Sequence, residues 1–237
     1  MKKTAVFVLA GLLLSGMGTV ARAADGFDKE LSGLRKNIIG MCAQLQAGQP
    51  KESPEQLLKE IDAITSGWDA LGAAYKDAPP ELYAKDPAWK SYFAEADDNF
   101  RIMRDKTEKK DYKRAMQFCG MNCALFVKIH QVNGVSTITD KMFSLRQNLK
   151  LVQGMTAAGN WGGANKTLEA ASKIVTEIEG MPSPSGEKNE SYADSIGNLK
   201  YSFEELKSAF KANDDAKFKS QLNKFWSEFN KIYQKYI

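Results

Sequence analysis

The residues best suited to chemistry in this chain are its three cysteines and its single histidine. Cys119, Cys123 and His130 follow one another at i, i+4 and i+11, which places them within about 40° of one another on one helical face. Met116 belongs to the same stripe. Thiolate, thioether and imidazole groups bind soft metal ions such as Cu(I), and thiolate and imidazole also bind Zn²⁺. The stripe therefore raises the hypothesis of a metal site inside a helical core.

The first 23 residues have the pattern of a secretory signal peptide. Lys2 and Lys3 precede an apolar run over residues 5–14, and Ala21-Arg22-Ala23 matches an Ala-x-Ala cleavage site. The run is too short to span a bilayer as a helix, so we expect cleavage before Ala24 and a periplasmic location. Three cysteines are an unusual count for an exported protein, because exported thiols usually pair.

The charge of the chain argues against several classes of partner. The formal net charge is +4, and it falls to +1 once Lys2, Lys3 and Arg22 leave with the signal peptide. A nearly neutral chain with interspersed Lys and Glu gives no electrostatic basis for binding nucleic acid or an anionic membrane surface. No segment after the leader approaches the length of apolar run that spans a bilayer, so no membrane span is expected there.

Helical periodicity dominates from Phe27 onward, and alternating β-branched runs are absent, so the sequence predicts an all-α protein. The first helix is expected over residues 27–45. Ser53-Pro54 and Asp86-Pro87 mark the starts of the next two helices, and Asp111 opens a fourth that Asn133-Gly134 ends. The second half is expected to form four more helices, at residues 139–158, 164–179, 191–212 and 214–236.

Short repeated motifs divide these eight helices into two halves. LRKN at residues 34–37 recurs as LRQN at 145–148, and KIHQ at 128–131 recurs as KIYQ at 231–234. We interpret the repeats as an internal duplication of an up-and-down four-helix bundle. The expected organisation is a signal peptide at residues 1–23 and two tandem four-helix bundles at residues 25–133 and 138–237.

The second half resembles the periplasmic cytochrome b562 family and the related cytochromes c-prime over nearly all of residues 138–237. The resemblance is carried by Asp140-Lys141-Met142 and Asn148-Leu149-Lys150 at the start of this half, and by NKIYQKY at residues 230–236. Proteins of this kind hold a heme between the helices of one bundle. In the b-type members a Met near the start of the first helix and a His near the end of the fourth are the axial ligands. The resemblance implies the bundle fold, heme b as a cofactor and electron transfer as a function.

The heme ligands that the resemblance implies are divided between the two halves. Met142 occupies the family's Met position in the second half, but Tyr233 stands at its His position, so we expect no heme there. In the first half His130 occupies the His position, while Leu31 stands at the Met position. A five-coordinate heme on His130 and a site that His130 shares with Met142 are two alternatives. A half-buried polar residue at a bundle end is the third.

The comparison with the family also places the third cysteine. The first and fourth helices of such a bundle are antiparallel, so the level that pairs Leu31 with His130 also pairs Cys42 with Cys119. The alternatives are a disulfide from Cys42 to Cys119 or Cys123, three buried thiols, or a soft-metal centre. In a metal centre the three thiolates would be supported by methionines, namely Met41, Met116 and Met121.

No catalytic residues are expected, because the chain lacks the G-x-S-x-G, phosphate-loop and H-E-x-x-H motifs. We therefore expect a non-enzymatic periplasmic protein that binds heme b or copper in the first bundle. Such a protein would serve electron transfer or metal handling with a periplasmic redox or metal partner. The competing hypothesis is a cofactor-free structural or binding module on the same scaffold, with a disulfide in the first bundle.

Overall fold

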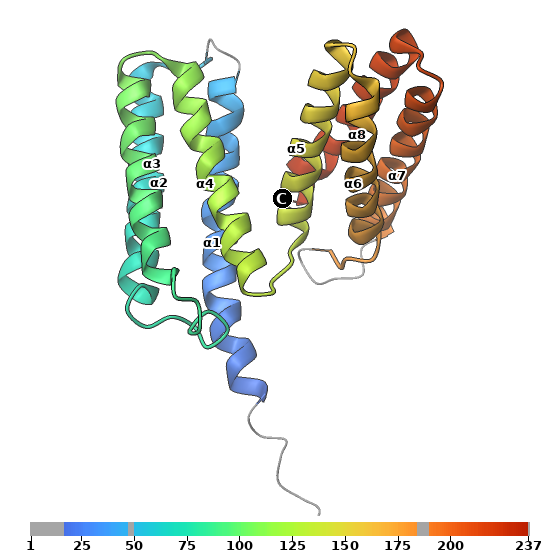
Figure 1. The fold of residues 1–237 in the computed structure, drawn as a ribbon. Coiled ribbons are helices and arrows are strands. Elements are labelled where there is room, and N and C mark those ends of the chain that lie inside the picture. The colour runs from blue at the N-terminus through green and yellow to red at the C-terminus, as the bar shows by residue number, and fades with distance from the viewer. Residues whose placement is uncertain (1–16, 47–49, 184–189, 237) are drawn as a thin grey trace, which may run out of the picture. The chain divides into compact units, whose positions relative to one another are not determined.

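The computed structural model describes residues 17–46, 50–183 and 190–236, and side chains from residue 26 onward. Over these ranges the chain is helical and contains no strand, which confirms the predicted all-α class. Residues 1–16 of the predicted signal peptide lie outside the described part of the chain. The helices are α1 (Met17–Gln46), α2 (Pro54–Tyr75), α3 (Trp89–Glu108), α4 (Tyr112–Val132), α5 (Ile138–Ala157), α6 (Trp161–Glu179), α7 (Glu190–Lys211) and α8 (Asp215–Tyr236) (Figure 1).

The helices belong to two compact units, with the boundary between Leu125 and Phe126. In the first unit α1 packs on α2 and α2 on α3, and a disulfide joins α1 to α4. In the second unit α5 packs on α6, α6 on α7 and α7 on α8. Contact between consecutive helices is the pattern of up-and-down bundles. Within each unit Figure 1 shows the helices running side by side.

The boundary between the units lies inside α4, whereas the sequence suggested a boundary in the segment after residue 133. The physical reason is that α4 continues unbroken to Val132, and its last turn bonds to the start of α5. Residues 126–132 are therefore grouped with the second unit although they belong to the same helix as Cys119.

Side-chain caps explain most helix starts. The Ser53 hydroxyl accepts a hydrogen bond from the amide of Gln56, and Pro54 follows as the first helical residue, as the sequence predicts. α6 begins at Trp161, three residues before the predicted start, because the Asn160 side chain caps it by accepting from the amide of Gly163 at 2.9 Å.

Two other helix starts differ from the sequence-based expectation. Asp86 does not cap α3, which begins at Trp89 without a side-chain cap; its carboxylate instead accepts from the amide of Ala88 at 2.8 Å within the preceding turn. α1 begins at Met17 rather than at Phe27. Three alanines in residues 18–26 favour the helical conformation and two glycines oppose it, and the helix extends back across the predicted cleavage site.

The core of the first unit combines an aliphatic stripe with aromatic rings. The buried residues of α1 recur every three or four positions, which directs one face of the helix inward. The ring of Phe27 meets the rings of Tyr83 and Trp89 edge-on, with centroids 5.2 and 5.1 Å away. Trp68 stacks on Phe93 at 4.8 Å, and its indole N–H donates to Asp97 at 2.9 Å. The rings and this hydrogen bond hold α2 against α3.

The core of the second unit is drawn from all four of its helices. Its members are apolar side chains that are at most 6% exposed. Phe203 and Phe225 meet edge-on across α7 and α8, with ring centroids 5.9 Å apart. The aliphatic side chains from α5 and α6 include Leu145, Leu149, Leu168 and Ile178.

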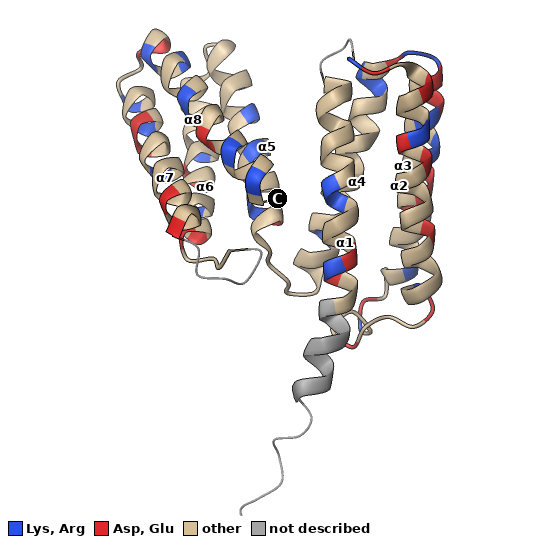
Figure 2. Cartoon of the chain, turned by 180° about the vertical axis from the view of Figure 1, so that it is seen from behind, with Lys and Arg blue, Asp and Glu red and all other residues tan. Residues whose placement is uncertain are grey.

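Charged residues of both signs are distributed along the helices of each unit (Figure 2). Most of the ion pairs are on the surface, such as Arg104 with Asp62 at 2.8 Å and Lys200 with Glu179 at 2.7 Å. None of the described helices combines the length and the apolar character needed to cross a membrane.

Candidate functional site

The cysteines form a disulfide and a separate thiol. Cys42 of α1 is bonded to Cys119 of α4, with their Cα atoms 5.7 Å apart, a usual separation for bridged cysteines. Cys119 is fully buried, and Cys123, one turn further along α4, is buried and remains a thiol. The structure therefore confirms the disulfide alternative and selects Cys119 over Cys123 as the partner of Cys42.

The residues predicted as soft-metal ligands are not brought together as one set. Met41 is 1% exposed, Met116 is half-buried, and Met121 is 47% exposed and faces away from the core. A disulfide sulfur carries no thiolate charge, so two of the three predicted thiolates are absent in this oxidised form. Among the described residues no group of three or more His, Cys, Asp or Glu side chains could hold a metal ion. Metal binding to the reduced protein stays a prediction.

His130 is held by a carboxylate at the junction of α4 and α5. Its Nδ1 lies 2.7 Å from Oδ2 of Asp140, and the two side chains are only 3% and 5% exposed. The same Oδ2 accepts hydrogen bonds from the hydroxyl and the backbone amide of Thr137, at 2.7 and 3.1 Å. Thr137 in turn caps α5 by accepting from the amide of Asp140. Asp140 therefore links the histidine to a capping box.

Asp140 has a role that the sequence analysis missed, since it appeared there only within a motif shared with the cytochromes. One signal could have identified it, because Thr137-x-x-Asp140 before an apolar run has the spacing of a capping box. The partnership with His130 has no such signal. It depends on the turn between α4 and α5, in which Gly134 adopts a left-handed conformation with φ of 72°.

The remaining residues implied by the cytochrome resemblance do not form a heme site in the second unit. Met142 is fully buried and packs within the apolar core of α5 to α8. Tyr233, at the family's His position, stacks on Phe229 with ring centroids 5.2 Å apart. Side chains therefore fill the space near Met142, and a heme between Met142 and Tyr233 does not fit this core. Leu31, at the other Met position, is likewise a fully buried core residue.

A buried amide of the first unit also escaped the sequence analysis. Asn122 is fully buried one turn after Cys119, and neither atom of its side-chain amide meets a hydrogen-bonding partner within the described ranges. Its position among apolar neighbours on the predicted core face of α4 was the available signal. A buried amide without a protein partner lowers stability unless water satisfies it.

Tyr92 and Asp105 of the first unit have strongly shifted pKa values. Burial, and the hydrogen bond that its hydroxyl donates to Asp86 at 3.1 Å, raise the pKa of Tyr92 to about 12. Hydrogen bonds from Lys106 and Lys109 lower the pKa of Asp105 to about 2 at the exposed C-terminal end of α3.

A polar groove lies between α7 and α8 of the second unit, with a volume of about 420 Å³. We call it the α7–α8 groove. Its lining residues recur at three- and four-residue intervals, so each helix presents one polar stripe to it. From α7 they are Asn198, Tyr201, Ser202 and Glu205, and from α8 Gln221, Lys224, Ser227, Glu228 and Lys231.

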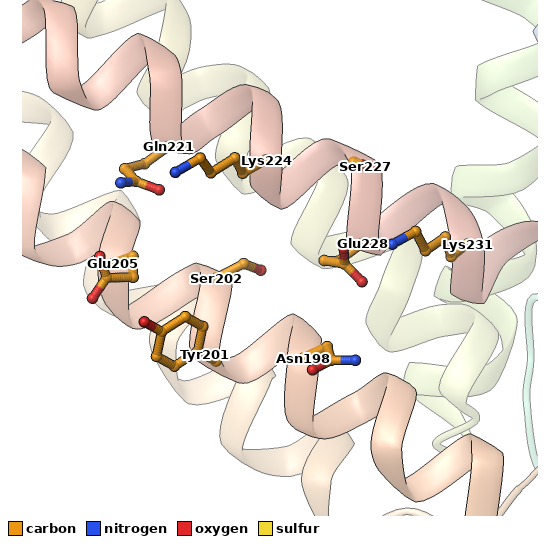
Figure 3. A pocket seen from close by; sticks show the side chains of 9 residues that line it. All are labelled: Asn198, Tyr201, Ser202, Glu205, Gln221, Lys224, Ser227, Glu228 and Lys231. Carbon is orange, nitrogen blue, oxygen red and sulfur yellow. Dashed lines mark hydrogen bonds and ion pairs between the residues drawn. The ribbon is translucent and has the colours of Figure 1, made fainter.

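The groove has a nearly buried floor and an exposed rim. Ser202 and Gln221 form the floor, at 7% and 8% exposure, while Tyr201 on the rim is 70% exposed. Lys231 donates to the carboxylate of Glu228 at 2.7 Å along α8. Figure 3 shows Ser202 of α7 and Glu228 of α8 directed toward the gap between the two helices. The sequence gives no sign of the groove, because charged and polar residues at helical spacing are equally typical of a solvated helix face.

Comparisons with known proteins identify no relatives: no family model, no curated protein and no solved structure matches this chain. The resemblance to cytochrome b562 thus depends on the quoted motifs alone and stays a prediction.

Proposed function

We propose that this protein is an exported, non-enzymatic binding module that works without a resident heme or metal. The observation that supports the proposal most directly is the Cys42–Cys119 disulfide. It uses two of the three soft ligands that a metal centre in the first unit would need, and disulfides persist mainly in proteins exported to oxidising compartments. The signal-peptide pattern of residues 1–23 supports the same location.

The helical scaffold suits a binding role. Binding residues are positioned more accurately on rigid helices than on loops. The disulfide closes a segment of 77 residues and stabilises the first unit by about 4 kcal/mol in a chain-entropy model. The second unit carries the α7–α8 groove on two helices with fully buried core faces. Catalysis has no comparable support, because the single histidine is buried against Asp140.

A second candidate function is heme binding through His130. One contact favours it. Metal-binding histidines usually donate the N–H of their second ring nitrogen to a carboxylate. With the proton on Nδ1, His130 makes this hydrogen bond to Asp140. The heme iron would then bind a single imidazole, since Met142 belongs to the α5–α8 core. When bound, the heme would supply one-electron chemistry.

The absorption spectrum and metal content of protein purified from a bacterial periplasm test the proposal. We expect no Soret band and no metal in stoichiometric amount. Added hemin should then give no saturable Soret shift. A stoichiometric metal, or a Soret band that disappears in His130→Ala but persists in the matched surface variant Gln147→Ala, would contradict the proposal; the second of these results would establish the heme candidate.

A further inference from the structure

The buried amide of Asn122 on α4 has hydrogen-bonding capacity that no protein group uses. Its side chain is fully buried, and neither the amide nitrogen nor the amide oxygen meets a partner within the described ranges. A side-chain amide offers two donors and an acceptor, and buried amides are nearly always bonded. Leaving all of them unbonded in a protein core would lower stability.

Asn99 of α3 is a second buried amide of the same kind. It is 4% exposed, and its amide nitrogen likewise meets no partner in the part of the chain that the structure describes. Both asparagines belong to the core faces of their helices, since Met103 and Cys119, about one turn away from them, are fully buried. The first unit therefore has two amides in its interior, one on each of two consecutive helices.

Contacts between the helices put the two amides at one level of the bundle. Three contacts relate the registers of α1 to α4, namely Cys42 with Cys119, Gln44 with Glu60 at 3.1 Å, and Trp68 with Asp97 at 2.9 Å. Counted along the helices from these contacts, Asn99 and Asn122 are level to within about one turn.

The connection between α3 and α4 makes these helices neighbours. α3 ends at Glu108 and α4 begins at Tyr112, and helices joined by so short a turn pack as an antiparallel pair. The axes of packed helices lie about 8–10 Å apart, so side chains that enter the core at one level are within reach of one small bridging molecule. Asn99 and Asn122 meet both conditions.

The donors and acceptor of the two amides match water. Water accepts from an amide nitrogen and donates to an amide oxygen, and internal waters typically occur about once per 27 residues with roughly three hydrogen bonds each. At about this level α1 and α2 contribute Ile38 and Ile64, which are buried and apolar and would leave an ion without a counter-charge. The buried guanidinium of Arg35 on α1 already takes part in an interaction of its own.

We propose that the core of the first unit contains an internal water site, in which ordered water bridges Asn99 of α3 and Asn122 of α4. The water accepts hydrogen bonds from the amide nitrogens and donates to the amide oxygen of Asn122. This bridge gives α4 a polar link to α3 in addition to its disulfide link to α1. The site goes beyond the proposed function, which does not depend on it.

Water-selective NOE and ROE spectra of the whole exported protein, labelled with ¹⁵N, test the proposal. The side-chain NH₂ groups of Asn99 and Asn122 should both show cross-peaks to water with opposite signs in the two spectra. Opposite signs identify water that stays bound for longer than the protein takes to tumble, and they exclude hydrogen exchange. Asn148 is the control within the same spectra, because it is half-buried and its amide donates to the carbonyl of Ser144 at 2.9 Å. It should not show this pattern.

Two substitutions of one residue separate the bridge from general effects. Asn122→Leu replaces the amide by an apolar side chain and should abolish the water cross-peak of Asn99. Asn122→Ser retains a hydroxyl and should keep that cross-peak, as should the surface variant Gln147→Ala.

Three results would overturn the proposal. The first is the lack of opposite-sign cross-peaks at either amide of the unsubstituted protein. The second is a direct contact between the two amides without water, and the third is a water cross-peak of Asn99 that persists unchanged in Asn122→Leu. If Asn122→Leu does not fold, the unsubstituted protein and Asn122→Ser still decide the matter.

Discussion

At the scale of single residues, Tyr92 shows how burial in this protein changes titration. Its side chain is 2% exposed, and its hydroxyl donates to a carboxylate of the turn before α3. Deprotonation would place a phenolate beside the buried Asp86. The folded protein therefore retains the Tyr92 proton to a pKa of about 12, above the ordinary value of 10.0.

The Tyr92 proton makes the first unit sensitive to alkaline pH. Because the pKa is higher in the folded than in the unfolded state, its contribution to stability is complete below pH 10 and is lost as the pH rises toward 12. The loss should be about 2 kcal/mol. Urea unfolding between pH 8 and 12, in roughly half-unit steps, should show a shallower alkaline decline in Tyr92→Phe. The exposed control Tyr201→Phe should retain the full decline, and equal declines in all three proteins would contradict this assignment.

The cysteines show which features of single residues could be predicted from the sequence and which could not. The spacing of Cys119, Cys123 and His130 placed all three on one helical face. That face is buried, His130 included, and each side chain is at most 4% exposed. The spacing could not decide which cysteine bonds to Cys42, since two thiols one turn apart on one face are equivalent in a sequence pattern. The choice depends on backbone separations of a few ångströms, which only the packed helices determine.

At the scale of helices, α4 and α5 are joined by a buried polar contact. Asp140 accepts from the Thr137 cap and bonds His130, so one carboxylate fixes the start of α5 against the end of α4. Helix types and most boundaries followed from periodicity and caps. The position of the unit boundary did not, because a cut in the loop is the default expectation from sequence and this polar contact involves the last turn of α4.

Removing the histidine should be more costly than removing the cap. His130→Ala leaves the Asp140 carboxylate buried without its imidazole partner, and we expect a loss of about 3 kcal/mol. Thr137→Val removes the cap and the hydrogen bond that its hydroxyl donates to Asp140. The imidazole and the Thr137 amide still contact that carboxylate, so the loss should be smaller, about 2 kcal/mol. Chemical unfolding followed by circular dichroism measures both losses. If the His130→Ala protein is at least as stable as Thr137→Val, the His130–Asp140 contact does not contribute substantially to holding α4 and α5 together.

At the scale of the whole molecule, the disulfide and the α7–α8 groove belong to different units. The Cys42–Cys119 bond belongs to the first unit and the α7–α8 groove to the second. Composition and periodicity predicted the helical architecture, because apolar residues repeated at helical spacing can be buried together only on one face of an α-helix. They did not predict the groove, since a polar stripe between two helices has the same pattern as a solvated helix face.

The most direct test of the central claim, a binding module stabilised by a disulfide instead of a metal, is the count of reactive thiols. Protein from an oxidising compartment is denatured without reductant, alkylated, digested and mapped by mass spectrometry. The structure predicts one alkylated cysteine, Cys123, and a peptide pair linked through Cys42 and Cys119. After reduction all three should react. Alkylation of all three cysteines without reductant, accompanied by a stoichiometric metal in the native protein, would contradict the account.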